Sequence, residues 1–133
     1  MFRLIRIENS GVNVPEPIKI TKEVGVAVKM GDALIASSGI VEPCGVSTAP
    51  TYIALSDAKP EDKFVYCYRV HPHMLFEVEL SKTPDSIYIG HKIKLATDLD
   101  GSTSMVSGDI GGPAEIIEIL GRGVAGDKVT VKF

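Results

Sequence analysis

The sequence predicts an all-β protein, a compact barrel or sandwich of short antiparallel strands with an extended N-terminal arm. Apolar and polar residues alternate over short runs, and glycine or proline turn signals separate these runs. No apolar pattern with the period of an α-helix persists for three turns. The final run is the clearest, because Val129, Val131 and Phe133 share one face opposite lysine and threonine. Many short strands at this spacing are typical of barrels and sandwiches.

The N-terminal segment, residues 1–17, is predicted to be a strand that continues into an extended arm. Residues 2–7 are apolar with two arginines interleaved. Two prolines and a glycine exclude a helix from residues 9–17. The rest of the chain, residues 18–133, is long enough to form a single β domain with its own core.

Short strands are predicted through the first half of this domain. Each is a run in which apolar residues alternate or cluster between turn signals: residues 18–21, 24–28, 33–36, 40–41 and 51–55. Gly31 and Gly39 supply turns between them. Residues 56–62 form a polar connector with room for one helical turn.

The clearest pair of predicted strands lies in the middle of the chain, at residues 64–70 and 74–80. A bend or short loop joins the two strands. One face of the first strand carries Phe64, Tyr66 and Tyr68, which either fill the core or anchor an interface.

Two further strands are predicted before the last one, at residues 92–95 and 114–120. The second of these is ambiguous, because Pro113 suits the first position of a helix. Its isoleucines and the glycines around it favour a strand.

Composition excludes several classes of function. The 133-residue chain is 44% hydrophobic, which indicates a globular rather than a disordered protein. The net charge is −3 and no run of Lys or Arg is present to neutralise phosphates, so we expect no nucleic-acid partner. No apolar stretch is long enough to span a bilayer, and the N-terminus lacks the apolar region of a signal peptide. We therefore expect no membrane partner and a soluble protein made inside the cell.

The two cysteines, Cys44 and Cys67, have no spacing that is typical of a zinc site. We expect both to be small buried hydrophobic residues. A single disulfide in an oxidising compartment is the alternative.

Two motifs resemble ligand-binding loops. Gly121 to Gly126 match the glycine pattern of a dinucleotide-binding loop, but only seven residues follow, so a hairpin turn without a cofactor is predicted. Residues 98–104 resemble the start of a calcium loop, with Asp109 at its final ligand position. The glycine of that loop falls two positions too early, so we expect a turn between strands, with a weak Ca²⁺ site at Asp98 and Asp100 as the alternative.

Three histidines are the remaining candidates for a site. His71 and His73 would face the same side of a strand, and a third metal ligand would come from His91, Cys67 or Glu77. Pro72 disturbs that geometry, so a loop with two partly exposed histidines is the favoured interpretation. No Gly-x-Ser-x-Gly and no cysteine in a protease context occurs, so we expect no catalytic residues and no cofactor.

Three segments occur in an order that resembles a known family. Residues 28–35 form a strand with a Gly-Asp turn, and residues 90–101 run from Gly-His-Lys-Ile-Lys-Leu to Asp-Gly. Residues 111–133 run from a Gly-Pro turn to the final Lys-Val-Thr-Val-Lys-Phe. This order is similar to the small all-β capsid decoration (cement) proteins of tailed bacteriophages and prophages, over residues 18–133. The chain differs from the commoner members by an insert at about 50–84 that is rich in Tyr, Phe and His.

The resemblance implies a non-enzymatic virion protein that binds the outer surface of the phage head and stabilises contacts between major capsid subunits. Its partner would be the major capsid protein, with self-association as a trimer as a further expectation. It would be found on the capsid surface, and in the host cytoplasm during assembly. The candidate interface residues lie in the arm and at the bend: Phe2, Arg3, Arg6, Val12, Val14, Pro15, Pro17, His71 and His73.

Two other functions remain open from the sequence. The first is a small β-barrel metal- or ligand-binding domain, or an enzyme, that uses His71, His73 and His91. The second is another virion part, either a head–tail connector or a tail-tube component.

Overall fold

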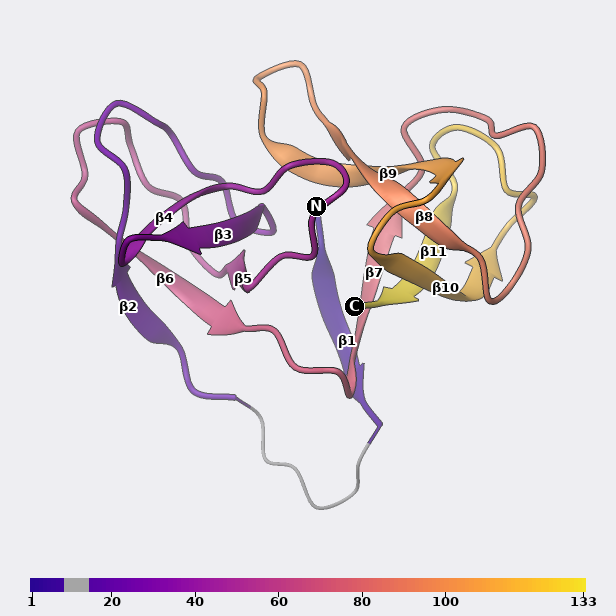
Figure 1. Cartoon of the computed structure of the whole chain (residues 1–133), viewed down its shortest axis with the longest axis horizontal. Helices are drawn as coiled ribbons and strands as arrows, with labels where there is room; N and C mark the ends of the chain where they lie inside the picture. Colours follow the sequence, from indigo (N-terminus) through magenta and orange to yellow (C-terminus); the bar gives the residue numbers. More distant parts are fainter. Residues whose placement is uncertain (9–14) are drawn as a thin grey trace.

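The computed structural model describes residues 1–8 and 15–133, and every regular element within them is a β-strand (Figure 1). No helix in these residues is long and apolar enough to cross a membrane. The strands are β1 (Arg3–Ile7), β2 (Ile18–Thr21), β3 (Ala33–Ser37), β4 (Ile40–Pro43), β5 (Tyr52–Ala54), β6 (Phe64–Arg69), β7 (Met74–Glu79), β8 (Lys92–Thr97), β9 (Thr103–Ile110), β10 (Ala114–Leu120) and β11 (Lys128–Lys132).

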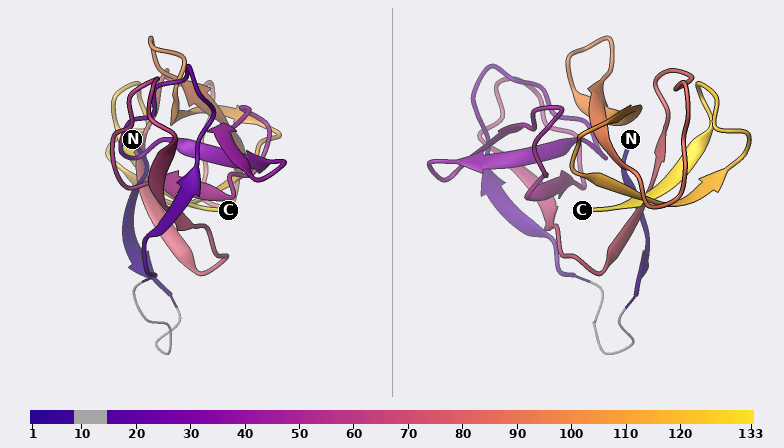
Figure 2. Two further views of the ribbon diagram at one scale, coloured as in Figure 1. Left: turned by 90° about the vertical axis from the view of Figure 1, so that its left-hand side faces the viewer. Right: turned by 45° about the vertical axis from the view of Figure 1, so that its right-hand side comes forward.

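The strands form two antiparallel sheets in a sandwich-like arrangement, so the predicted fold class is confirmed. The larger sheet has six strands in the order β1-β7-β11-β10-β8-β9, and the smaller has five in the order β2-β6-β5-β3-β4. Figure 1 shows the smaller sheet on the left and the larger on the right, with β1 between them. The right-hand view of Figure 2 shows the same separation of the two sheets.

Each sheet is strongly curled. The curl brings together strands that are not neighbours in the sheet order, and single β-bridges join them. In the smaller sheet, Lys22 after β2 bridges Val41 of β4. In the larger sheet, Leu80 after β7 bridges Val106 of β9. Each curl wraps around its own apolar cluster, and β1 remains as the end strand of the larger sheet.

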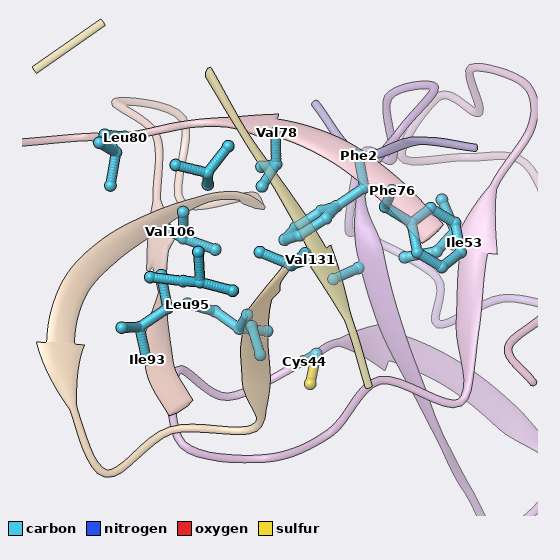
Figure 3. Close-up of a cluster of buried hydrophobic side chains, with 14 of the residues drawn as sticks. Phe2, Cys44, Ile53, Phe76, Val78, Leu80, Ile93, Leu95, Val106 and Val131 are labelled. Carbon is cyan, nitrogen blue, oxygen red and sulfur yellow. The ribbon is translucent and has the colours of Figure 1, made fainter. Parts of the chain in front are cut away.

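The larger cluster fills the larger sheet and the junction between the two sheets (Figure 3). Phe76 and Val131 contribute to it from the larger sheet, while Ala33 and Ile53 reach it from the smaller sheet. Burial of each large side chain stabilises the fold by about 1.5–3 kcal/mol, which accounts for the joining of the two sheets into one body.

The smaller cluster lies on the opposite face of the smaller sheet. Leu34 of β3, Val41 of β4, and Val65 and Cys67 of β6 belong to it. Because Ala33 and Leu34 are adjacent in β3 and point to opposite faces, the two clusters are separated by the thickness of the sheet.

The predicted pairing of the two central strands was wrong. Strand β6 pairs with β2 and β5, whereas β7 pairs with β1 and β11 in the other sheet. The residues between them, 70–73, cross from one sheet to the other (Figure 1). Both strands match their predicted positions. Short apolar strands carry little information about which strands they pair with, so tertiary packing decided the pairing.

Two strand predictions failed for opposite reasons. Residues 24–28 alternate like a strand but form a loop, in which only Val28 makes a bridge, to Ala58. The buried ammonium of Lys22 binds the carbonyl of Val26 at 2.6 Å, which draws this loop around the lysine. Strand β9 was missed because serine, threonine and glycine dominate it, and its serines and threonine are nevertheless buried.

Residues 50–84 contribute β5, β6 and β7, so this aromatic-rich stretch supplies strands to both sheets. The described part of the N-terminal segment belongs to the larger sheet and its core, because β1 pairs with β7 and Phe2 is buried. The other strands were predicted to within a few residues, and β10 is a strand as favoured.

Candidate partner-binding surface

A groove of about 540 Å³ runs along β1, between the larger sheet and the smaller one. We call it the β1 groove. Residues from β1, from the turn after Val28 and from β5 and β6 line it: Met1, Phe2, Arg3, Leu4, Ile5, Arg6, Ile7, Met30, Ile53, Ala54, Leu55 and Tyr68. Its walls are mostly apolar, which is typical of a binding groove rather than of a solvated surface.

The outer edge of β1 faces this groove. The N–H of Glu8 donates to the carbonyl of His73 on the β7 side, at 2.8 Å. The N–H of Phe2 points the other way and donates to the carbonyl of Gly31, also at 2.8 Å. Because backbone directions alternate along an antiparallel strand, Leu4 and Ile7 direct their N–H and C=O groups away from β7, toward the groove.

A bulge in β1 explains its unusual pattern of exposure. The register with β7 shifts between Leu4 and Arg6, which leaves Ile5 as the extra residue. Leu4 packs against the larger core, whereas Ile5 is 43% exposed on the outer side. The bulge therefore presents a large apolar side chain beside the unpaired backbone edge.

The turn at Gly31 closes the groove at the start of β1. Gly31 has φ +87°, and a Cβ at this position would lie 2.5 Å from the Cβ of Met1. Only glycine allows the turn to adopt this conformation and to approach the N-terminal residues so closely. The hydrogen bond from Phe2 to Gly31 thus fixes one end of the groove.

A row of aromatic side chains extends from the groove along β6. Phe64 and Tyr66 are 48% and 49% exposed, and Tyr68 lines the groove itself. The opposite face of β6, with Val65 and Cys67, is the buried one. Phe64 and Tyr66 are therefore solvent-accessible, and core filling is wrong for them.

The predicted interface residues of the arm fall into three groups. Phe2 borders the groove but is only 2% exposed, because its side chain packs in the larger core. Val12 and Val14 lie outside the described residues. Pro15 is half-buried and Pro17 is exposed, directly before β2.

The two arginines of β1 both border the groove and are exposed. Arg3 pairs with Glu77 of β7 at 2.9 Å, and Lys128 also lies 3.2 Å from this carboxylate. Two cations therefore lie within ion-pair distance of the Glu77 carboxylate. Arg6 makes no ion pair among the described residues, so the groove has a basic border.

His71 and His73 are exposed in the connection between β6 and β7, as the loop interpretation predicted. The backbone of His73 accepts the hydrogen bond from Glu8 at the end of β1. The structure thus brings this connection and the end of β1 to the same end of the molecule, which Figure 1 shows at the bottom.

The three histidines do not form a metal centre. No group of three His, Cys, Asp or Glu side chains is placed to hold a metal ion within residues 1–8 and 15–133. His91 lies before β8, where its ring packs edge-on against Tyr88 at a centroid distance of 5.2 Å. The cluster required by the metal-binding alternative is therefore not assembled.

Among the described residues, the carboxylates of the calcium-loop alternative are not gathered into a cation site. The Asp98 carboxylate accepts hydrogen bonds from the N–H groups of Asp100 and Ser102, at 2.9 and 3.1 Å, and from the Ser104 hydroxyl at 3.1 Å. Burial raises the pKa of Asp98, but these hydrogen bonds outweigh it and hold the pKa below its ordinary value. Asp109 lies on β9 and pairs with Lys82 instead.

The turn at Asp98 also contacts the smaller sheet. Lys29 forms an exposed ion pair with Asp100, which raises the pKa of the lysine. Asp32 is buried beside this pair and accepts the N–H of Lys29 at 2.8 Å. Burial raises the pKa of Asp32.

The cysteines are buried and free, as expected. Cys44 lies in the larger cluster and Cys67 in the smaller, so the sheet between them prevents a disulfide. Burial raises the pKa of Cys44 to about 11 and that of Cys67 to about 12.

Comparison with known proteins identifies the fold. No family model and no curated protein matches the sequence. Among solved structures, the chain is similar to the head fiber gp8.5 N base in bacteriophage phi29, with a TM-score of 0.53 and 21% sequence identity. The match covers 89% of this chain and 94% of that chain, so the two share a fold over nearly their whole length.

The residues that give the groove its apolar walls were not predicted as a set: Ile5, Met30, Leu55 and Tyr68. A signal for Ile5 was present, because Leu4 and Ile5 are adjacent apolar residues in a strand that can bury only one of them. The other residues come from the smaller sheet, and their proximity to β1 depends on tertiary structure.

Proposed function

We propose that this protein is a non-enzymatic structural component of a tailed-phage virion that attaches to the outer surface of the head. Its partner is the major capsid protein, and its finer role is to bridge and stabilise neighbouring capsid subunits. The observation that carries the proposal is the fold shared with the phi29 head fiber base over 89% of the chain.

The surface supports a binding role rather than catalysis. The β1 groove and the aromatic row of β6 form an exposed apolar area, which soluble monomers rarely keep without a partner. The only described lining residues of the groove that carry charged side chains are arginines, and no acid–base pair faces it. Many identical weak contacts over a capsid give strong overall attachment.

Co-sedimentation with phage heads tests the proposal directly. The purified protein is mixed with heads of the phage that encodes it, assembled without this protein, across a salt series. We expect saturable binding at a fixed ratio to the major capsid protein, with the salt slope reporting the electrostatic contribution. Absence of binding to expanded heads would overturn the proposal.

Two further measurements separate the finer roles. If the protein stabilises subunit contacts, decorated heads will withstand heating better than undecorated heads. If it is a connector or tail-tube component instead, the isolated protein will form rings, and binding will be confined to one vertex. Analytical ultracentrifugation of the free protein also tests the trimer that the resemblance predicts.

A further inference from the structure

We propose that the β1 groove accepts an extended, acidic segment of the partner protein, which adds to the larger sheet as a strand beside β1. This inference rests on the proposed function for the identity of the partner as a capsid protein. The class of ligand is inferred from the groove alone: it is a β-strand with alternating apolar and acidic side chains.

The backbone edge of β1 is open on the side of the groove. Strand β1 ends the larger sheet, and Leu4 and Ile7 direct their N–H and C=O groups toward the groove. None of these four groups has a backbone partner elsewhere in the described part of the chain. An added strand is the ligand that satisfies such a row of donors and acceptors.

The wall of the groove opposite β1 is apolar. Leu55 and Tyr68 of the smaller sheet face β1 across the groove, and Ile5 lies on the β1 side. Alternate side chains of an added strand would contact this wall, and the others would face solvent. A helix is disfavoured because it cannot use the backbone edge of β1.

The groove carries positive charge at its border. Both charged side chains that line the groove are arginines, although the whole chain has a net charge of −3. Arg3 is paired with Glu77, whereas Arg6 has no ion pair among the described residues and leaves a positive charge at the groove. This local reversal of sign favours an acidic segment.

A synthetic peptide tests the ligand class without phage components. The probe is a capped peptide in which glutamate and valine alternate, and the control probe replaces glutamate by lysine. We expect the acidic peptide to shift the amide resonances of Leu4 and Ile7, and the basic peptide to bind at least about tenfold more weakly. No binding, or shifts confined to another surface, would overturn the inference.

Two variants in the groove test where the peptide binds. A third variant, at an exposed apolar residue outside the groove, is the control. Ile5→Lys should weaken the acidic peptide at least about tenfold, and Arg6→Glu should transfer the preference to the basic peptide. The matched control is Ile110→Lys, since Ile110 is 63% exposed on β9 at the opposite end of the larger sheet. Circular dichroism and melting temperature verify that each variant is folded.

The same variants distinguish this inference from the proposed function. If the wild-type protein does not bind heads, the proposed function fails, whatever the peptide result. If heads bind the wild type, Ile5→Lys and Ile110→Lys equally, the groove inference fails and the proposed function stands. A concentration-dependent dimer that Ile5→Lys abolishes would show a second copy as the occupant and overturn the acidic-segment inference.

Discussion

The rings of Phe2 and Phe133 lie with their centroids 5.7 Å apart and their planes tilted by 57°. Phe133 also contacts Phe76 of β7, at a centroid distance of 5.8 Å. These three rings join the residues before β1 and after β11 to the centre of the larger sheet, and they secure β1 beside its groove.

The aromatic contact at Phe76 should be a major contributor to stability. Phe76 is fully buried, so Phe76→Ala should lower the free energy of unfolding by about 3–5 kcal/mol. The matched control is Phe64→Ala, which removes an exposed ring with one lysine contact and should cost no more than about 1 kcal/mol. Urea unfolding measures both values, and equal losses would contradict this assignment of the core.

Lys22 should be required for the closure of the smaller sheet. Its side chain is 1% exposed, and its ammonium donates to the carbonyls of Glu23 and Val26 at 2.8 and 2.6 Å. Lys22→Met keeps the apolar stem but leaves these carbonyls unpaired, so we expect a loss of about 2–3 kcal/mol. Lys92→Met, at an exposed position, is the control and should be nearly neutral. Comparable urea midpoints for the two variants would refute the structural role.

The two thiols should resist alkylation until the protein unfolds. With pKa values of about 11 and about 12, Cys44 and Cys67 remain protonated at pH values near 8, and both are buried. Iodoacetamide labelling followed by mass spectrometry should show two unmodified thiols in buffer and two modified thiols in urea. Rapid labelling of either cysteine in buffer would contradict its placement, and Cys44→Ser and Cys67→Ser variants identify which thiol reacts.

Asp32 and Asp98 should affect stability with opposite dependence on pH. The pKa of Asp32 is raised, so its ionised form opposes folding, and wild type should lose stability relative to Asp32→Asn as the pH rises from about 3 to about 7. The pKa of Asp98 is lowered, so wild type should gain stability relative to Asp98→Asn over the same interval. Urea unfolding at several pH values checks both signs. The same sign for both variants would contradict the hydrogen bonding at Asp98.

The order of short strands was predictable because local patterns produced it. Val129 and Val131 alternate with polar residues in the sequence and are buried in β11. Strand β9 was not predictable in this way, because Thr103 and Ser104 look like turn residues until neighbouring segments bury them. The hydroxyl of Thr103 reaches the backbone carbonyl of Cys44, a partner that is remote in the sequence.

The candidate surface was only partly predictable for the same reason. Arg3 and Arg6 were chosen from the arm, and both border the groove. Tyr68 was noted as an aromatic of a central strand, but its position in the β1 groove depends on β6 and β7 lying in different sheets.

By itself, the sequence determined the all-β class, most strand positions and the burial of both cysteines, because alternation and turn residues act over a few neighbouring positions. Tertiary structure decided which strands pair, that β6 and β7 separate into two sheets, and that β1 keeps an open edge beside an apolar wall. Those outcomes depend on long-range packing, in which a strand joins whichever neighbour buries its apolar face, and no local pattern encodes that choice.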